Sequence, residues 1–459
     1  MDDQNHEHGA HDDKDQGRPW HRRISDRLRR GGLVTYMRNI DVYGLSHAPR
    51  RYHKGMKQLW LFGFLLSCAG AFYASYIPLY LLSLGASRTE VGWLSSAASF
   101  FGLLGPIPGA ILTRRWGKPR TMVVLFSALR RFMLLFAALA PLFLSGQILI
   151  FGVILALGLR FAFIGLYNPA FISLMATLVP QKIRGRYLGG RKMAMAMASV
   201  LLVPFAGWMI ERIGEPAGYQ ITIGIAVAFG LLGAFQIAQV PDSQVQRTVE
   251  ADQDGGSLWD ALRSNKLFRY YLLIRLFWNF ARRLGGPYFR VYQREVLLSS
   301  TQTIGLLVTV SAVTRLVGQR FWGTLVDRKG AAWVLCVSAL TIPLLPFVWV
   351  FASEPWHIVF TAAPGGFLWA GFNMGALNLL LSLPETRHRT QSAAAHTTVI
   401  RVANMIAPLV GDVVIRQWGY RWDFAISGFG RLAGAFLFLI LLKPFGARST
   451  QGHPEAERI

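Results

Sequence analysis

The sequence predicts an all-α membrane protein, a bundle of about twelve helices arranged as two six-helix halves. Hydrophobic residues make up 53% of the 459 residues, and they gather in long runs separated by short polar segments. The run "ITIGIAVAFGLLGAFQIA", residues 221–238, is long enough to cross the ~30 Å hydrocarbon layer as one helix. Because lipid offers the backbone no hydrogen-bond partners, helices are the expected way to span it.

The apolar runs place these helices in chain order, on either side of a polar linker. In the first half we expect helices over residues 59–84, 90–113, 120–144, 147–179, 189–213 and 219–240. In the second half we expect them over residues 267–298, 302–324, 331–352, 357–383, 391–416 and 421–444. The predicted domains are therefore a tail 1–56, a half 57–240, a linker 241–266, a half 267–444 and a tail 445–459.

Basic residues between the runs predict the orientation in the membrane. The net charge is +24, and the Lys and Arg residues gather in alternate loops. Those loops carry Arg114, Arg115, Lys118, Arg120, Lys182, Arg184, Arg186, Arg191, Lys192, Arg328, Lys329, Arg387 and Arg389. The positive-inside rule then predicts a multi-pass protein of the plasma or inner membrane with both termini in the cytoplasm. The same pattern suits anionic lipid surfaces, and we expect no nucleic acid partner.

The cysteines and the N-terminal histidines bear on whether the protein holds a cofactor, a metal or a disulfide, and we expect none. Cys68 and Cys336 lie inside predicted helices, far apart in the chain, which indicates neither a disulfide framework nor a metal site. The N-terminal tail contains "NHEHGAHDDKD", residues 5–15, and its histidines leave metal binding open. We favour a solvated segment for this tail because its composition cannot build a core.

An internal repeat relates the two halves. The segment from Asn168 to Gly214 and the segment from Asn373 to Gly419 both open on Asn and close on Gly after the same length. In both, a proline ends the first helix and a cluster of arginines follows. Such a parallel duplication of six-helix halves is a known plan of membrane transporters.

The loop "GTLVDRKG", residues 323–330, carries a more specific resemblance. It is similar to the signature Gly-x-Leu-x-Asp-Arg-x-Gly of the major facilitator superfamily, and "GAILTRRWG", residues 109–117, stands at the same place in the first half. Together with the repeat, the helix number and the linker, this loop is typical of that family. The resemblance implies a transporter that works by alternating access.

The signature loops also predict gating residues. The expected set is Gly109, Gly323, Asp327, Arg328, Gly330 and Arg186. Gly109 and Gly323 would let a neighbouring helix approach closely. Asp327 is expected at the start of a helix, where the helix dipole favours a carboxylate. The resemblance implies that it pairs with Arg184, Arg186 or Arg191, whereas Thr113 of the first half cannot form an ion pair.

Arginines at mid-depth are the strongest functional signal. The stretch "LFWNFARRLGGPYF", residues 276–289, holds Arg282 and Arg283 in the middle of a predicted span. Each arginine at such a depth costs at least ~2.5–3.5 kcal/mol, so it must face a wet cavity, pair with another group or bind something. The cavity candidates are Arg160, Arg282, Arg283, Arg315 and Arg401. The resemblance places the helices of Arg130, Arg131 and Arg431 at the periphery, so we rank those three lower.

The apolar spans hold no acid at mid-depth to pair with these arginines. Glu90, Glu211, Glu295, Asp412 and Asp423 all fall near the extracytoplasmic ends. Backbone carbonyls and side-chain amides, such as those of Asn168, Asn279 and Asn404, could accept hydrogen bonds from these arginines. An anionic cargo could instead balance their charge. Arginine suits carboxylates and phosphates because its planar fork gives paired hydrogen bonds. We do not expect a carboxylate proton relay, and His357 and His396 are not well placed for one.

The first and tenth helices add side chains for the body of a cargo. The predicted substrate-binding set consists of the five cavity arginines, Asn279 and four residues of these two helices. Those four stand among small residues and are Tyr73, Tyr76, Trp369 and Asn373. Packing alone would also explain such aromatics. Pro78 and Pro287 occupy matching places in the first and seventh helices, where we expect kinks.

These features predict a facilitative or secondary active transporter, acting as a monomer, for a small anionic or amphipathic organic solute. Anion exchange, uniport or a proton carried by the cargo would each fit. One alternative is efflux of hydrophobic drugs or lipid-like compounds, for which Arg160 and Gly165 weakly resemble an exporter motif. Another alternative is a non-transporting assembly or sensing factor. An enzyme is not expected, because no catalytic or ATP-binding arrangement is present.

Overall fold

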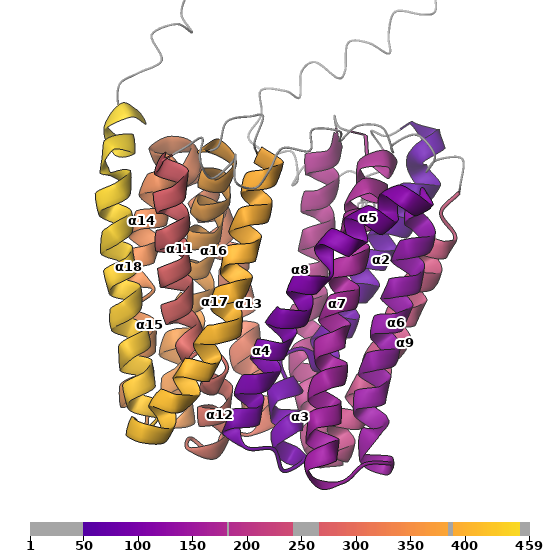
Figure 1. Ribbon diagram of the computed structural model, residues 1–459, viewed down its shortest axis with the longest axis horizontal. Helices are drawn as coiled ribbons and strands as arrows, with labels where there is room; N and C mark the ends of the chain where they lie inside the picture. Colours follow the sequence, from indigo (N-terminus) through magenta and orange to yellow (C-terminus); the bar gives the residue numbers. More distant parts are fainter. Residues whose placement is uncertain (1–48, 181–182, 242–265, 384–388, 450–459) are drawn as a thin grey trace, which may run out of the picture.

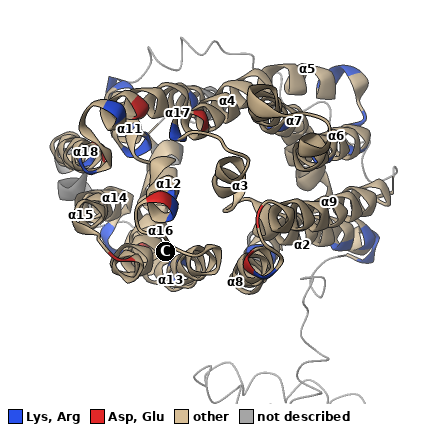
Figure 2. Ribbon diagram, turned by 90° about the horizontal axis from the view of Figure 1, so that it is seen from below, with Lys and Arg blue, Asp and Glu red and all other residues tan. Residues whose placement is uncertain are grey.

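The computed structural model describes residues 49–180, 183–241, 266–383 and 389–449, and helices are the regular elements of these ranges. Seen from one end, the helices form two bundles around a central region (Figure 2). One bundle contains α2 to α9 and the other contains α11 to α18. This arrangement confirms the predicted bundle of two halves. The histidine-rich tail lies outside the described residues, and the exact domain limits remain predictions.

The first bundle contains the six predicted spans, two of them interrupted. Its helices are η2 (Arg50–Tyr52), α2 (His53–Tyr73), α3 (Ile77–Ser83), α4 (Arg88–Leu104), α5 (Pro106–Trp116), α6 (Pro119–Leu139), η3 (Ala140–Leu142), α7 (Gly146–Leu178), α8 (Arg184–Ile213) and α9 (Ala217–Ala238). The first predicted span is α2 with α3, and the second is α4 with α5.

The second bundle repeats this order. Its helices are α11 (Lys266–Leu284), α12 (Tyr288–Glu295), α13 (Thr301–Lys329), α14 (Ala331–Thr341), α15 (Leu344–Phe351), η6 (Pro355–Ile358), α16 (Val359–Ser382), α17 (Arg389–Trp418) and α18 (Tyr420–Ser449). Within the described ranges, 10 helical segments are long and apolar enough to cross a membrane. Neither the pair α11–α12 nor α16 is among them, and in α11–α12 arginines interrupt the apolar stretch.

The helix breaks lie beside the two prolines, as predicted. Between α2 and α3 the chain leaves the helix at residues 74–76, and Pro78 stands in the first turn of α3. Between α11 and α12 it leaves the helix at residues 285–287, and Pro287 is the residue before α12. Proline removes a backbone donor and clashes with the preceding turn, so it favours such breaks.

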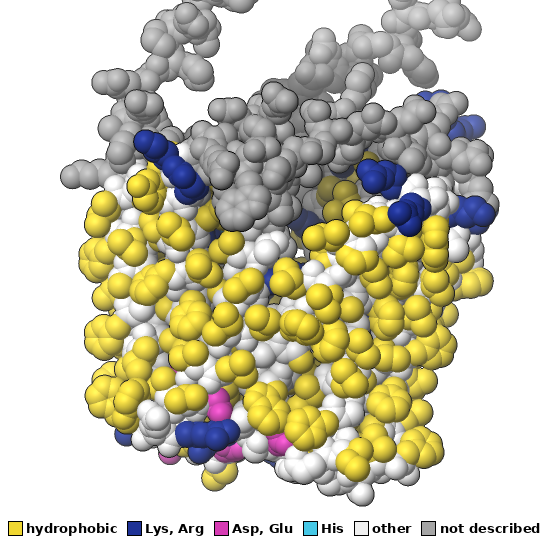
Figure 3. Space-filling model, viewed as in Figure 1, with side chains coloured by type: hydrophobic (Ala, Val, Ile, Leu, Met, Phe, Trp, Pro, Cys, Tyr) yellow, Lys and Arg dark blue, Asp and Glu magenta, His cyan; other side chains and the backbone are white. Residues whose placement is uncertain are grey.

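The outer surface carries an apolar belt between charged rims (Figure 3). Large hydrophobic side chains such as Phe151, Leu201, Phe235 and Phe436 are about half exposed or more. In a water-soluble protein such a surface would be an association site, whereas in a bilayer it faces lipid. Inside each bundle, buried aliphatic and aromatic side chains form separate clusters, including one around Phe62 and Met122.

The repeat seen in the sequence is a repeat of helix pairs. The 30-residue helix α8 ends at Gly214, and the 30-residue helix α17 ends at Gly419. These glycines have φ of 93° and 86°, a conformation that L side chains rarely adopt. The shared Gly therefore marks the same sharp turn into the last helix of each half.

The two ends of the bundle differ in charge. We call the end that carries Arg114, Lys118 and Arg328 the basic end; the chain also enters and leaves the bundle there (top of Figure 1). The opposite end, which we call the far end, carries Glu215 and Glu295. The acids Glu90, Glu211, Asp412 and Asp423 also lie toward the far end, as predicted.

One prediction about the signature loop is wrong. Asp327 was expected at a helix start, but it lies in the last turn of α13, which continues to Lys329 and ends at Gly330 with φ of 84°. The helix continues because nothing before Gly330 interrupts it, so the Asp327 carboxylate stands near the negative end of the α13 dipole.

The two signature glycines also differ from each other. A methyl group at Gly109 would meet the Leu166 backbone of α7, at 2.5 Å from its carbonyl oxygen. A methyl group at Gly323 would meet only the end of the Met374 side chain, at 3.3 Å. The close backbone approach predicted at Gly323 is instead found at Gly318. A methyl group at Gly318 would lie 2.9–3.0 Å from backbone atoms of Phe367. The prediction therefore holds for the first half only.

Candidate functional site

A central cavity lies between the two halves and consists of two lobes. The first lobe has a volume of about 640 Å³ and lies mainly against the second bundle, where Leu307, Trp349 and Trp369 line it. The second lobe, of about 720 Å³, is lined from the first bundle by Tyr73, Leu157 and other side chains. Ala74, Arg283, Gly286 and Arg290 line both lobes and therefore mark where they meet.

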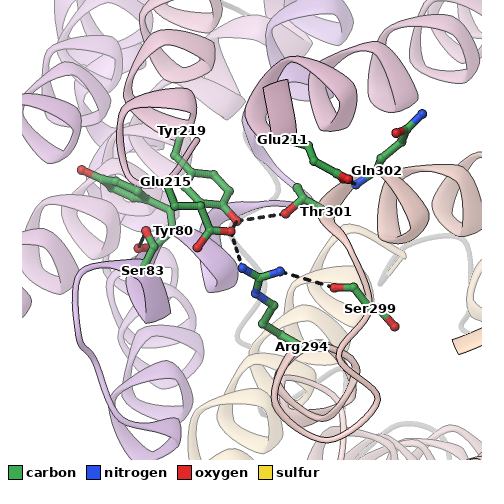
Figure 4. A network of polar contacts seen from close by, with 9 residues as sticks. All are labelled: Tyr80, Ser83, Glu211, Glu215, Tyr219, Arg294, Ser299, Thr301 and Gln302. Carbon is green, nitrogen blue, oxygen red and sulfur yellow. Dashed lines mark hydrogen bonds and ion pairs between the residues drawn. The ribbon is translucent and has the colours of Figure 1, made fainter. Parts of the chain in front are cut away.

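At the far end the halves are held together by polar contacts (Figure 4). Arg294 donates to the Glu215 carboxylate at 2.7 Å, and the Tyr219 and Thr301 hydroxyls lie 3.4 Å apart. The backbone N–H of Gln302 donates to Glu211 at 3.0 Å. These contacts join the last two helices of the first half to the far ends of α12 and α13.

A second far-end contact joins α4 to α17. Thr89 donates to Asp412 at 2.9 Å, and Arg416 lies at 2.9 Å from the same carboxylate. Arg416 also donates to the Thr89 hydroxyl at 2.8 Å. Among the described residues, the hydrogen bonds that we identify between the halves all lie at the far end. These contacts close the cavity at the far end, and Figure 1 shows the helices of the two bundles diverging toward the basic end.

Arginines dominate the polar lining of the cavity. The lining arginines are Arg160, Arg282, Arg283, Arg290, Arg315, Arg401 and Arg431. No Asp or Glu of the described ranges lines either lobe. The cavity therefore carries a strong positive potential, which the low dielectric of the surrounding bundle does little to screen.

Two asparagines hold the adjacent arginines of α11. The Asn279 side-chain oxygen accepts from Nε and Nη2 of Arg282 at 3.1 and 2.8 Å. Its amide nitrogen donates at 2.7 Å to the Asn404 side-chain oxygen, which also accepts from Nε of Arg283 at 3.0 Å. This chain of amides orients both guanidinium groups and leaves their charge uncompensated. The terminal nitrogens of Arg283 make no hydrogen bond within the described part of the chain.

Two further arginines of the lining are held by neutral side chains. Arg290 donates to the Gln293 side chain at 2.7 Å, and Arg160 donates to the Tyr73 hydroxyl. The Arg282 guanidinium lies 5.6 Å from the centre of the Trp369 ring. Arg315 and Arg401 have no hydrogen-bond partner that the described residues supply. An anion in the cavity would therefore find guanidinium groups that are positioned but not neutralised.

Seven of the ten predicted binding residues line the cavity. These are Tyr73, Arg160, Arg282, Arg283, Arg315, Trp369 and Arg401. Asn279 lies behind the wall and acts through Arg282 and Asn404. Tyr76 is buried and donates to the Val203 carbonyl at 2.6 Å, so its hydroxyl serves packing between α8 and the break after α2. Asn373 is exposed and lines neither lobe.

Three lining residues were missed or ranked too low. Arg431 was placed at the periphery, but α18 turns it into the first lobe, where it donates to the Arg282 carbonyl at 3.3 Å. Arg290 follows Arg283 by seven residues, a helical spacing that could have indicated a shared face. His396 was considered only as a poorly placed proton carrier, yet it lines the second lobe, and its Nε2 accepts from Nε of Arg275 at 3.3 Å.

The predicted latch at the basic end is not formed by the side chains that the structure describes. Asp327 is exposed, Arg184 donates to carbonyls at the end of α7, and Arg191 is buried over the Phe171 ring. The Arg186 side chain lies outside the described residues. Thr113 donates to the Gly109 carbonyl within its own helix at 2.7 Å, which agrees with its inability to form an ion pair.

Comparison with known proteins identifies the family. The family model described as Major Facilitator Superfamily matches residues 59–297 and 280–458. The multidrug resistance protein MdtG of Salmonella typhi is 26% identical over 413 residues, which are 86% of this chain and 95% of that protein.

Two solved structures share the fold. A mutant form of the nucleoside transporter NupG superimposes with a TM-score of 0.67 at 14% identity, covering 84% of this chain and 99% of that one. The xylose transporter XylE from E. coli, in an inward open conformation, superimposes with a TM-score of 0.62 at 16% identity. That match covers 85% of this chain and 96% of XylE.

Proposed function

The chain belongs to the major facilitator superfamily, so it is a multi-pass membrane transporter and not an enzyme, and on that premise we propose that it carries a small organic anion by alternating access. In that mechanism the two halves rock about a central site that opens to one side of the membrane at a time. The far-end contacts close one side of this site, and the lobes between the halves offer room for the cargo.

The arginine lining without acids is the observation that carries the anionic cargo. Arg283 and Arg290 line both lobes, and their hydrogen-bond acceptors are the neutral side chains of Asn404 and Gln293. Buried charges are normally paired, because an unpaired one is costly in a low-dielectric site. A carboxylate or phosphate of the cargo would supply the missing charge and accept paired hydrogen bonds from the guanidinium fork.

The size and apolar lining of the lobes favour an organic anion over a small inorganic one. Volumes of about 640 and 720 Å³ match pockets that hold organic ligands. Leu307 and Trp349 in the first lobe, and Leu157 and Phe161 in the second, offer apolar contacts. An amphipathic molecule could therefore place its charge near Arg283 and its apolar part in either lobe.

We assign the basic end to the cytoplasm of a plasma or inner membrane. The loops at that end carry the excess of Lys and Arg that cytoplasmic loops typically carry. With this orientation both termini are cytoplasmic and the far-end closure lies outside. The conformation is then inward-facing, and the likeness to XylE in an inward open conformation supports this assignment.

Export of hydrophobic compounds is the second candidate. The relatives named multidrug resistance protein MdtG favour it, as does the apolar part of the cavity lining. A methyl group at Gly165, the glycine of the weak exporter resemblance, would lie only 2.7 Å from the Cα atom of Gly105, so this glycine serves close helix packing. An anionic drug would satisfy both candidates, whereas a cationic or neutral one would require the arginines to be structural.

Thermal stability of the purified protein against a panel of solutes tests the proposal. A ligand raises the melting temperature according to its concentration relative to its dissociation constant. We expect organic anions to stabilise the wild type, and Arg283→Gln and Arg315→Gln to lose this response. Arg114→Gln, on the basic rim outside both lobes, is the matched control and should keep it. Stabilisation by cations or neutral amphiphiles alone would reject the anionic cargo.

A further inference from the structure

Asp423 is a buried carboxyl group that the transport mechanism above does not use. It lies in the first turn of α18 with 0% of its surface exposed. Neither carboxylate oxygen has a hydrogen-bond partner among the described residues. A buried and unpartnered carboxylate costs far more free energy than its neutral form, so this environment favours a bound proton.

The surroundings of Asp423 are helix backbone and aromatic rings. A methyl group at Gly285 would meet one carboxylate oxygen at 3.1 Å, and a methyl group at Gly411 would meet the other at 3.2 Å. The adjacent Phe424 ring stacks on Phe289, with their centres 4.5 Å apart. Gly285 opens the break between α11 and α12, so Asp423 is packed against the point where that span bends.

The charged and titratable neighbours of Asp423 are engaged elsewhere. On its own helix, Arg431 donates to Ser427 at 2.9 Å, and the Tyr420 hydroxyl donates to Glu295 at 2.8 Å. From α12, the Tyr288 hydroxyl donates to the Pro408 carbonyl at 2.6 Å. From α17, Asp412 is paired with Arg416 at 2.9 Å. Arg431 interacts with Asp423 through its charge, but without a hydrogen bond.

The same neighbours form one side of the far-end closure. The Tyr288 hydroxyl lies against Gly92 of α4, in the opposite half. Asp412 follows Gly411 directly and accepts from Thr89, also at the start of α4. Tyr288 and Asp412, which adjoin the segments that cover Asp423, are therefore in contact with α4 when the far end is closed. Movement of α4 away from α12 and α17 would admit water to this pocket.

We propose that Asp423 is a proton-binding site that holds its proton while the far end is closed and releases it when the far end opens. Hydration would stabilise the carboxylate in the open state, whereas the dry pocket stabilises the neutral acid in the closed state. By linkage, low pH then favours closure and high pH favours opening. The inference rests on the alternating-access part of the proposed function and is independent of the cargo.

Spin labels across the far end test the linkage. Arg212→Cys on the first half and Gln417→Cys on the second provide exposed labelling positions, and both native cysteines are buried. Electron–electron distance measurements would give the populations of closed and open molecules. One released proton predicts that the ratio of open to closed rises by up to about tenfold per pH unit. Asp423→Asn, which imitates the protonated acid, should stay closed throughout.

Two further measurements keep the test decisive. Glu211→Gln is the matched control: its amide oxygen can still accept from Gln302, so the pH dependence should persist. Infrared spectra of the unlabelled wild type should show the carbonyl stretch of a protonated carboxyl at neutral pH, absent in Asp423→Asn. The proposal is overturned if that band is missing, or if the distances ignore pH or respond to it equally in Asp423→Asn. The cargo proposal is judged separately, by the thermal response to anions.

Discussion

The two walls of the cavity are built on the same scaffold but carry different chemistry. The second half contributes Arg282, Arg283, Arg290, Arg315, Arg401 and Arg431, whereas the first half contributes Arg160. The helix pairs α7–α8 and α16–α17 nevertheless repeat each other, down to the glycine that ends the second helix. Duplication therefore preserved the fold, while the charge that meets the cargo was concentrated on one wall.

The way each wall holds its arginines differs as well. On the second-half wall, amide side chains link Arg282, Asn279, Asn404 and Arg283 into one chain across α11 and α17. On the first-half wall, Arg160 donates to the phenol of Tyr73. A linked set keeps several guanidinium groups in one geometry, which lowers the ordering cost of binding an anion. The second-half wall should accordingly dominate recognition.

The largest effect is expected from Arg283→Gln. Loss of a guanidinium at the junction of the lobes removes a charge-assisted pair with the cargo, and we expect binding of a stabilising anion to weaken about 100-fold. Isothermal titration of the purified protein measures this. Arg114→Gln should leave the affinity within about twofold. Equal losses in both variants would mean that the effect comes from net charge rather than from the cavity.

Asn404→Asp sharpens the comparison by adding charge to the same wall. The new carboxylate would pair with Arg283 and compete with the cargo, so we expect anion affinity to fall about 30-fold while the melting temperature without ligand rises. Asn404→Leu is the companion variant. It removes the side-chain oxygen that accepts hydrogen bonds from Arg283 and Asn279. That variant should lower the melting temperature. Tighter anion binding in Asn404→Asp would contradict the proposed role of the unpaired guanidinium.

Arg160→Gln tests the other wall. Because one arginine rather than a linked set is lost, we expect anion affinity to fall only about tenfold. The measurement is the same titration, with Arg130→Gln as control, since Arg130 donates to Tyr167 at 3.1 Å and lines neither lobe. A loss as large as that of Arg283→Gln would show that the two walls contribute equally.

The smallest expected effect is a difference in stability between alanine substitutions at the two signature glycines, one in each half. Gly109→Ala forces a methyl group onto the Leu166 backbone, and we expect a loss of about 1–3 kcal/mol in unfolding free energy. Gly323→Ala meets only the flexible end of Met374, so the loss should stay below about 1 kcal/mol. Denaturant unfolding in detergent compares them. Equal losses would mean that the two halves pack their signature glycines alike.

Much of the fold and part of the site could be predicted from local sequence. The spans follow from apolar length, the breaks from Pro78 and Pro287, and the depth of Arg282 and Arg283 from counting along the helix. The error at Asp327 arose because the signature loop does not show where α13 stops, and Gly330 decides that through its backbone conformation. Arg431 was ranked low because the family resemblance places its helix at the periphery, whereas the packing of α18 brings this side chain into the first lobe.

The sequence alone determined that this is a helical membrane protein with two repeated halves, because hydrophobic length and spacing are local properties that the bilayer selects directly. Only the tertiary structure decided which charges share a cavity. Arg160, Arg290 and Arg401 come from three distant helices, and their meeting depends on how α7, α12 and α17 pack. It also decided that Asp423 is dry, because the residues that exclude water from it belong to other helices.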